Sequence, residues 1–554
     1  SPDDRPDSDL LLRAYEVWGP ECVGHLVGVF AFAIWDRQAR RLFAARSPVV
    51  APMLMYHATE RSFAFATAPC GLHALPDVPR ALDERRLAEM LVMRGDSSSF
   101  RTLYLQISRL PTGHTCHASA QGIKIECFWR PDPRREIRYR RDEEYIAAFG
   151  ELFERVVGDH LRGTSQVAVQ LSGGLDSSAV AATAARLLSS RGERLTAFTE
   201  VPSPNFTGKI PRGWYADETP LVEAIAARID NLDLNLMHTE GQFFLDGLDR
   251  LFSHLEAPFR NTANRVWMEA ILREAARRGI KVLLDGMQGN LTMSWNGSGL
   301  LPGLIRARKW GQYTRQARAS RAFWRTLAGQ VALPLLPGPL RRAVEGWRDP
   351  TSWAGTAWLA HSPIHPGFAA AQRISEWARE RGNGHPARAA TDSRQSRYHA
   401  LASQDFGGYI GAYRALFGVD MRSPPADVRL TEFCLALPEE QFLRDGVPRS
   451  LLRRAMAASL PETVLANRMR GMQAADWFSR LIGARGQIAA TLSGFEQSDL
   501  ASRMLDLPRM RRLFERLPDR AADHDGQLRE YQHVFSRGLM IGSFLRWFEA
   551  GNRR

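Results

Sequence analysis

The stretch QVAVQLSGGLDSSAVAATAARLL, residues 166–188, decides the fold. An apolar run of strand length leads into a turn rich in glycine and serine, and a helix pattern of small residues follows at once. The adjacent Gly173 and Gly174 let the backbone turn sharply and approach a ligand closely. Serine hydroxyls and the free amides of a helix start present donors to an anion. The stretch therefore predicts a cradle for phosphate or pyrophosphate, with a purely structural turn as the alternative.

Asp176 stands inside this cradle. A carboxylate is poorly placed to face phosphate directly, so we expect Asp176 to hold a magnesium ion that bridges the phosphates. A Gly-Gly turn alone would be weak evidence, whereas the complete string between a strand and a helix is a strong signal.

Strands and helices alternate around the cradle. Apolar strands are expected at 166–171, 195–200, 232–237 and 281–286, with helices at 177–190, 217–228 and 266–278 between them. This alternation predicts a parallel sheet that binds its ligand at the carboxyl ends of the strands. From about residue 396 onward the pattern is mostly helical.

The chain before residue 140 has a different pattern. A helix and several short apolar strands, separated by turns of hairpin length, occupy residues 9–67 and predict a small α+β domain with one paired sheet. The charged stretch RPDPRREIRYRRDEE marks a boundary near residues 130–142. Two domains are therefore expected, at 1–140 and 141–554.

The positive charge of the chain is concentrated in one place. The 554 residues have a net charge of +13, which requires that an anionic partner be considered. Residues 291–397 hold 16 Lys and Arg against 5 Asp and Glu, a net +11, and seven of the 14 tryptophans. Either the tryptophans of this insert pack in a core and its arginines face solvent, or the two residue types form a surface that binds an extended peptide or polyanion.

The spacing of the cysteines and the hydropathy of the chain indicate in which cellular compartment the protein is expected. The five cysteines are too scattered for a disulfide framework and form no CxxC pair, and Cys22 and Cys70 are expected in packed positions. No apolar run is long enough to span a bilayer, and the acidic start lacks the features of a signal peptide. The sequence predicts a cytoplasmic protein without a membrane span.

The string SGGLDSS resembles the pyrophosphate loop of ATP pyrophosphatases of the asparagine synthetase type, which cleave ATP between the α and β phosphates and pass AMP to a carboxylate. Residues 8–36 resemble the glutaminase (class II amidotransferase) domain of this family, and LTAFTE, YADETPLVEAIAARI, GVDMRSPPAD and LPETVLANRMRG resemble later segments in the same order. The resemblance implies ATP and Mg²⁺ as cofactors. It implies that ATP is bound by Leu171, Ser172, Gly173, Gly174, Asp176, Ser177, Ser178, Phe198, Thr199, Asp285 and Gly286.

The glutaminase-like part departs from the family pattern. Glutamine-dependent members use an N-terminal cysteine as nucleophile, whereas this chain begins with Ser1. The family run DRxGxxPLYY corresponds here to RSPVVAPMLMY, residues 46–56, without the aspartate and the glycine. We expect a truncated or relic domain without glutaminase activity.

The second phosphate-side loop also departs from its family form, SGEGSDE, and reads DGMQGN at residues 285–290. Asn290 stands where the family has a metal-binding aspartate, and Met287 where it has a carboxylate associated with the amino-group substrate. An amide oxygen can complete an oxygen shell but adds no charge, so Asp285 is a hypothetical substitute ligand. The predicted metal ligands are thus Asp176, Asp285 and Asn290.

The family element Arg-x-Lys-Glu corresponds to RMRGMQAADW, residues 468–477. Arg470 keeps a positive charge, which predicts that it stabilises the pentavalent phosphate or the tetrahedral intermediate. Arg470 and Asp176 are therefore the predicted catalytic residues. The alternative is that Arg468 and Arg470 cap a helix or face solvent.

All of these departures resemble one subgroup, the lasso peptide cyclases or macrolactam synthetases. The resemblance implies that ATP adenylates an Asp or Glu side chain of a precursor peptide, whose N-terminal amine then closes an isopeptide ring without ammonia. It implies peptide contacts at Gln473 and Asp476, and a leader peptidase and a leader-binding protein as further partners.

Other functions are compatible with parts of the pattern. An ammonia-dependent asparagine synthetase or a β-lactam synthetase-like ligase has no evident need for the basic insert. A tRNA-modifying ATP pyrophosphatase would account for the charge, but neither catalytic cysteines nor a nucleic-acid module is visible, so we expect no nucleic-acid partner. A catalytically dead scaffold is disfavoured by the intact SGGLDSS string.

Overall fold

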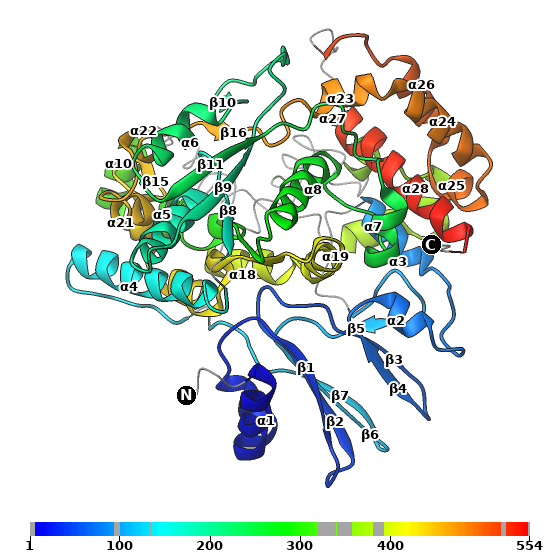
Figure 1. Ribbon diagram of the computed structural model, residues 1–554, viewed down its shortest axis with the longest axis horizontal. Coiled ribbons are helices and arrows are strands. Elements are labelled where there is room, and N and C mark those ends of the chain that lie inside the picture. Colours follow the sequence, from blue (N-terminus) through cyan, green and yellow to red (C-terminus); the bar gives the residue numbers. More distant parts are fainter. Residues whose placement is uncertain are drawn as a thin grey trace.

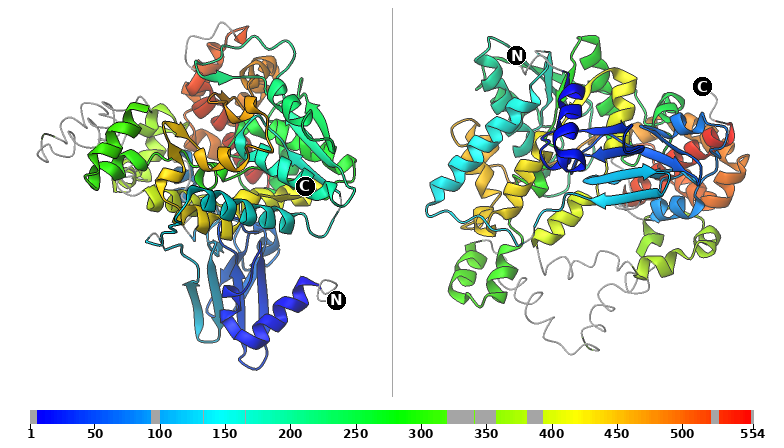
Figure 2. Two further views of the ribbon diagram at one scale, coloured as in Figure 1. Left: turned by 90° about the vertical axis from the view of Figure 1, so that its left-hand side faces the viewer. Right: turned by 90° about the horizontal axis from the view of Figure 1, so that it is seen from below.

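The computed structural model describes residues 6–92, 100–132, 134–164, 166–319, 340, 357–380, 393–521 and 528–551. Figure 1 shows an N-terminal domain (blue to cyan) below a parallel sheet with its helices (green), and a helical C-terminal part (orange to red) beside that sheet. In the side view of Figure 2 the N-terminal domain projects from the rest of the molecule. No helix within the described ranges is long and apolar enough to cross a membrane.

The N-terminal domain contains two antiparallel sheets. The first has the order β1-β2-β6-β7 and consists of β1 (Ala31–Asp36), β2 (Arg41–Arg46), β6 (His114–Ser119) and β7 (Gly122–Cys127). The second has the order β4-β3-β5 and consists of β3 (Met55–Ala58), β4 (Phe63–Ala66) and β5 (Ser108–Arg109). The helices are α1 (Asp7–Trp18), α2 (Pro69–His73) and α3 (Glu84–Val92).

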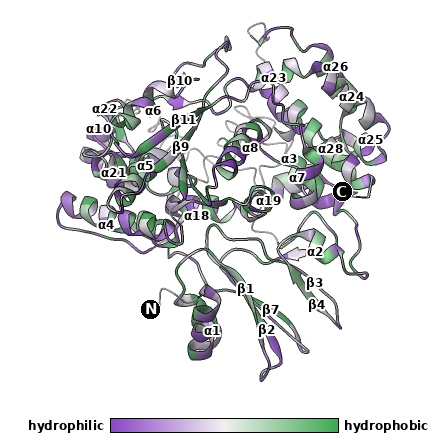
Figure 3. Ribbon diagram, in the orientation of Figure 1, coloured by the Kyte–Doolittle hydropathy of each residue, from purple (hydrophilic) through white to green (hydrophobic). Residues whose placement is uncertain are grey.

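The prediction of one paired sheet was therefore wrong in this detail. Arg46 at the end of β2 contacts the second domain, and residues 47–52, between β2 and β3, leave the first sheet, so the following strands form a sheet of their own. Figure 3 shows hydrophobic colour along β1 and β2 and hydrophilic colour at their hairpin tip, which points away from the second domain.

The central sheet of the second domain is parallel throughout, in the order β11-β9-β8-β12-β13. Its strands are β8 (Val167–Gln170), β9 (Leu195–Glu200), β11 (Leu232–Met237), β12 (Val282–Leu284) and β13 (Asp420–Arg422). The four strands expected from the sequence are confirmed. The strand β13 was missed, because only Met421 of its three residues is apolar and the segment was assigned to the helical region.

Helices pack on this sheet through closely fitting apolar faces. They are α4 (Asp142–His160), α5 (Leu175–Ser189), α6 (Thr219–Ala226), α7 (Leu248–Leu255) and α8 (Thr262–Arg277). Alanines along α5 allow it to lie close to β8, while Phe149 and Phe153 of α4 fill the space beyond it. This packing fixes the N-terminus of α5 at the carboxyl edge of the sheet.

The C-terminal part is helical, as expected, and carries two short strand pairs. The pairs are β10 (Trp214–Tyr215) with β16 (Arg470–Gly471), and β14 (Leu443–Arg444) with β15 (Val447–Pro448). The helices are α19 (Gly407–Phe417), α20 (Val428–Ala436), α21 (Ser450–Ala455), α22 (Glu462–Leu465), α23 (Trp477–Gly483), α24 (Arg485–Glu496), α25 (Asp499–Met504), α26 (Leu507–Glu515), α27 (Leu528–Glu530) and α28 (Arg537–Glu549).

The basic insert is described only in part, as α9 (Leu300–Arg306), α10 (Trp310–Ala319), α15 (Pro366–Ala371), α16 (Ile374–Glu380) and α18 (Ser393–Ala402). Of its described tryptophans, Trp358 and Trp377 are buried in the main core, and Trp295 stacks on the buried Arg397. Trp310 is 48% exposed. The packing interpretation therefore holds for most of the described tryptophans; Trp324, Trp347 and Trp353 lie outside the described residues.

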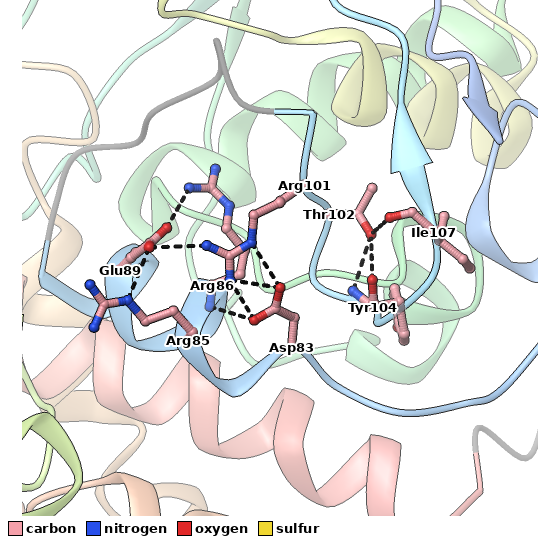
Figure 4. Close-up of polar contacts among 8 residues, drawn as sticks. All are labelled: Asp83, Arg85, Arg86, Glu89, Arg101, Thr102, Tyr104 and Ile107. Atoms are coloured by element: carbon pink, nitrogen blue, oxygen red, sulfur yellow. Dashed lines mark hydrogen bonds and ion pairs between the residues drawn. The ribbon is translucent and has the colours of Figure 1, made fainter. Parts of the chain in front are cut away.

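The second sheet of the N-terminal domain is attached to α3 by a charged cluster, drawn in Figure 4. Arg101 donates to both oxygens of Asp83, at 2.6 and 2.7 Å from Nη2, and its Nη1 reaches Glu89 at 3.2 Å. From the same loop, the Tyr104 hydroxyl donates to the Glu256 carbonyl oxygen at 3.0 Å in the second domain. This loop therefore forms one of the contacts between the two domains.

Candidate active site

The predicted phosphate cradle follows β8 and is ordered by its own serines. The hydroxyls of Ser172 and Ser177 lie 2.7 Å apart, and Ser172 Oγ accepts the amide of Gly174 at 3.2 Å. Ser178 Oγ donates to the Gly174 carbonyl at 2.7 Å. Gly173 has no room for a side chain, because a Cβ there would lie 3.1 Å from the Tyr215 hydroxyl and closer still to Leu221. The glycine predicted for a close backbone approach is required by this packing.

The end of β9 lies beside the cradle. The Leu171 amide donates to the Phe198 carbonyl at 2.9 Å, so the carboxyl ends of the two strands are in register at the site. Thr199 is fully buried, and its hydroxyl has no hydrogen-bond partner among the described residues. The structure thus brings Leu171, Phe198 and Thr199 together, as expected for one edge of a nucleotide site.

Asp176 is held at one oxygen and unpartnered at the other. Its Oδ2 accepts the Ser294 hydroxyl at 2.9 Å, while its buried Oδ1 has no partner among the described residues. Burial raises the pKa of Asp176 to about 6. A cation bound at Oδ1 would satisfy this oxygen and restore the charged form. The unpartnered oxygen therefore fits a magnesium ion whose other ligands are phosphate oxygens. The described residues contain no group of three or more acids, histidines or cysteines placed to hold a metal ion.

The second loop lies directly against this carboxylate. A Cβ on Gly289 would overlap the Asp176 carboxylate, and one on Gly286 would lie 2.7 Å from the Ser177 amide nitrogen. The Asp285 side chain is buried, accepts the Met287 amide at 2.9 Å, and has its pKa raised to about 6 by burial. Asn290 is exposed and directly follows Gly289, the residue that contacts Asp176. The structure brings both loops together, while metal binding by Asp285 and Asn290 stays a prediction.

The strand pair β10–β16 brings Arg470 to the same edge of the sheet. The Arg470 amide donates to the Gly213 carbonyl at 3.0 Å, and its exposed guanidinium lies 5.7 Å from the Trp214 ring. Gly471 packs on the Glu218 carboxylate so closely that a Cβ there would overlap Glu218 Oε1. A catalytic role for Arg470 stays a prediction, but the segment that holds it does line the cradle.

Two glutamates to whose side chains the sequence analysis gave no role lie at this junction. Glu218 accepts the Gly173 amide at 3.1 Å, and Glu200 accepts the Ala474 amide at 3.2 Å. Burial raises the pKa of Glu218 to about 7, although the bond from Gly173 opposes the shift. Burial also raises the pKa of Glu200 to about 7. Both carboxyls can therefore exchange a proton near neutral pH.

The two predicted peptide contacts have different surroundings. Gln473 is exposed, and its Oε1 accepts the Asn264 amide at 2.6 Å. Asp476 is 2% exposed and is tied to the Ser203 amide at 3.1 Å and to Arg480 at 2.6 Å. Peptide binding by Gln473 and Asp476 stays a prediction; the observed contacts of Asp476 hold the turn after β9.

A further cation faces the site. Arg449 has a left-handed backbone, at φ +58°, and its half-buried guanidinium lowers the pKa of Asp176 against the larger effect of burial. It lies at the start of α21. Sequence reasoning missed Arg449, Ser294 and Glu218, because each reaches the cradle only through the tertiary fold.

A parallel α/β sheet whose serine-glycine loop faces a second glycine-containing loop across a buried aspartate defines a nucleotide-binding protein of the pyrophosphate-loop class. The chain belongs to the asparagine synthase family, whose model matches residues 148–546. A glutamine amidotransferase domain model matches residues 3–129. The family is one of ATP-dependent amide ligases, and the predicted α/β architecture with an N-terminal glutaminase-like domain is confirmed.

Curated relatives share this family over part of their length. The chain is 31% identical to asparagine synthetase [glutamine-hydrolyzing] 3 of Bacillus subtilis over 32% of this chain and 29% of that protein. It is 27% identical to a putative asparagine synthetase of Mycobacterium tuberculosis and 25% identical to amidase chyE of Penicillium rubens, each over 50% of this chain and 41% of the relative. The matches thus span less than half the length of these relatives.

Proposed function

We propose that the protein is an ATP-dependent macrolactam synthetase that closes an isopeptide ring in a precursor peptide, in the manner of lasso peptide cyclases. The observation that carries the proposal is the second loop, where Met287 stands in place of the carboxylate of the family pattern beside an amino-group substrate, while Gly289 lies against Asp176. A nucleophile tethered to its own electrophile does not need a separate amine site.

The first step is adenylation of an Asp or Glu side chain of the peptide. A carboxylate oxygen attacks the α-phosphorus of ATP, the bond from that phosphorus to the bridging oxygen breaks, and pyrophosphate leaves. The amides and hydroxyls of residues 172–178 would bind the phosphates, and Arg449 would add a positive charge beside them. A magnesium ion held by Asp176 would neutralise phosphate charge.

The second step is ring closure. The N-terminal amine of the peptide attacks the acyl carbon, loses a proton, and AMP leaves. Glu218 would accept this proton, since its carboxylate lies between the cradle and Gly471. Arg470 would stabilise the negative charge that develops on the tetrahedral intermediate.

The peptide would be accompanied by a leader-binding protein and a leader peptidase, and described parts of the insert would form its docking surface.

The test is incubation with MgATP and a precursor peptide that has an internal Asp or Glu. We expect a product that has lost one water, together with AMP and pyrophosphate; unchanged peptide with ATP consumed on free aspartate would contradict the proposal.

The second candidate is an asparagine synthetase that uses free ammonia. Its support is that the similar proteins of Bacillus subtilis and Mycobacterium tuberculosis are named asparagine synthetases. It predicts asparagine formation from aspartate, ammonium and MgATP, which amino-acid analysis of an incubation with these three compounds measures.

A further inference from the structure

Residues 46–52 of the N-terminal domain enter the second domain beside its second phosphate-side loop. Arg46 is fully buried, and its guanidinium donates to both oxygens of Asp405, at 3.1 and 3.2 Å. The remaining donors are used by main-chain carbonyls of Pro52 at 2.8 Å, Ala51 at 3.1 Å and Leu110 at 2.5 Å. A buried guanidinium with this many charge-assisted and backbone bonds is held in one position.

Asp405 is equally well held. Burial alone would raise the pKa of Asp405, but Arg46 and Arg109 hold it below its usual value. Its Oδ1 also accepts the Gly407 amide at 3.1 Å at the start of α19. The connection between α18 and α19 is therefore fixed by the N-terminal domain.

This connection reaches the active-site loop through Gln404, the residue that precedes Asp405. Gln404 accepts a hydrogen bond from Gln288 Nε2 at 3.2 Å. Gln288 is 8% exposed, has a left-handed backbone at φ +71°, and directly precedes Gly289, which lies on Asp176.

An apolar cluster also connects residues 46–52 with the second phosphate-side loop. Val49 and Val50 are buried in one cluster with Leu401 of α18, and Leu291, directly after the loop, packs on that cluster. Val49 has φ +61°, a conformation that a β-branched residue adopts only when its surroundings impose it. These valines occupy the segment that departs from the family's DRxGxxPLYY pattern.

We propose that residues 46–52 brace the second phosphate-side loop of the synthetase domain, acting through Asp405 and Gln404. The N-terminal domain thereby positions Gly289 against Asp176 for ATP binding. Arg46, Asp405 and Gln404 are positioning residues: none of them touches the cradle itself. The proposal rests on the ATP site of the proposed function, and it is independent of which carboxylate is activated.

The test is the dissociation constant for MgATP, measured by calorimetry on the full chain without any peptide. Gln404→Met keeps the side-chain volume but removes the hydrogen bond to Gln288. We expect about fivefold weaker binding, the size of effect of one neutral hydrogen bond, with only a small fall in melting temperature. Arg46→Lys should weaken binding at least as much, and the double variant should be no weaker than the stronger single variant, because both act on one element.

The matched control is Tyr104→Phe, which removes a hydrogen bond between the same two domains, to Glu256, without involving the second loop. We expect its MgATP affinity to equal that of the wild type. The proposal would be overturned if Gln404→Met bound MgATP as tightly as the wild type, or if Tyr104→Phe lost as much MgATP affinity as Gln404→Met. If the wild type binds MgATP but cyclises no peptide, the proposed function fails and the brace stands.

Discussion

The backbone of Gly289 lies against the carboxylate of Asp176, leaving no space for a side chain at position 289. Gly289→Ala should therefore displace either the second loop or Asp176, and we expect ATP–pyrophosphate exchange to fall by about 100-fold or more, because active-site groups tolerate displacements well below 1 Å. Gly311→Ala in α10 is the control, since a Cβ there meets nothing within 4 Å. Equal activity in the two variants would contradict the loop contact.

Asp176→Asn tests the metal-binding assignment. The amide keeps an acceptor for Ser294 but loses the charge, and we expect exchange to fall by about 100-fold or more. Because the pKa of Asp176 is raised, its carboxyl destabilises the fold increasingly as the pH rises from about 4 to about 6. At pH 7.5 the melting temperature of Asp176→Asn should thus equal or exceed that of the wild type, measured without ATP. A large loss of stability would indicate a structural role instead.

Glu218→Gln separates the two chemical steps. Glutamine can still accept the Gly173 amide, so we expect exchange to be nearly unchanged, whereas ring closure should slow by about 100-fold. The base is the ionised carboxylate, and its pKa is about 7, so ring closure in the wild type should rise with pH through about 7. In the variant the part of that rise centred near 7 should be absent, which leaves only the rise near about 8 from deprotonation of the peptide's own amine. The pH profile of single-turnover product formation measures this; equal profiles would remove Glu218 from the reaction.

Arg470→Ala tests the cation on the β10–β16 pair. Because the Arg470 guanidinium is exposed over Trp214, its loss should leave the fold intact. We expect product formation to slow by about 10- to 100-fold with less than a twofold change in the KM for ATP. Arg468→Ala, two residues away and also exposed, should be close to the wild type. Unchanged turnover in Arg470→Ala would show that the residue only faces solvent.

Local sequence patterns were sufficient to predict most of the central sheet and the position of the cradle. The apolar runs at β8, β9, β11 and β12 predicted four of the five central strands, and the glycine-serine turn predicted the cradle. The strand β13 was not predicted, because an edge strand of three residues with charged ends has no clear periodicity.

The carboxyl groups around the cradle were only partly predictable. Ser294 lies 118 residues from its partner Asp176, and nothing near it in the sequence indicates the contact. Glu218 could have been singled out as an acid at the start of the helix after β9, but its burial and its bond to Gly173 follow from tertiary packing. The link from Arg46 to Asp405 joins two domains across 359 residues and was invisible for the same reason.

The most direct test of the central claim is the carboxylate dependence of ATP–pyrophosphate exchange. We predict rapid exchange with a precursor peptide that has an internal Asp or Glu, and background exchange with the same peptide after Asp→Asn or Glu→Gln substitution. Free aspartate should also give only background exchange. Exchange driven equally well by free aspartate would contradict the account and establish the synthetase alternative.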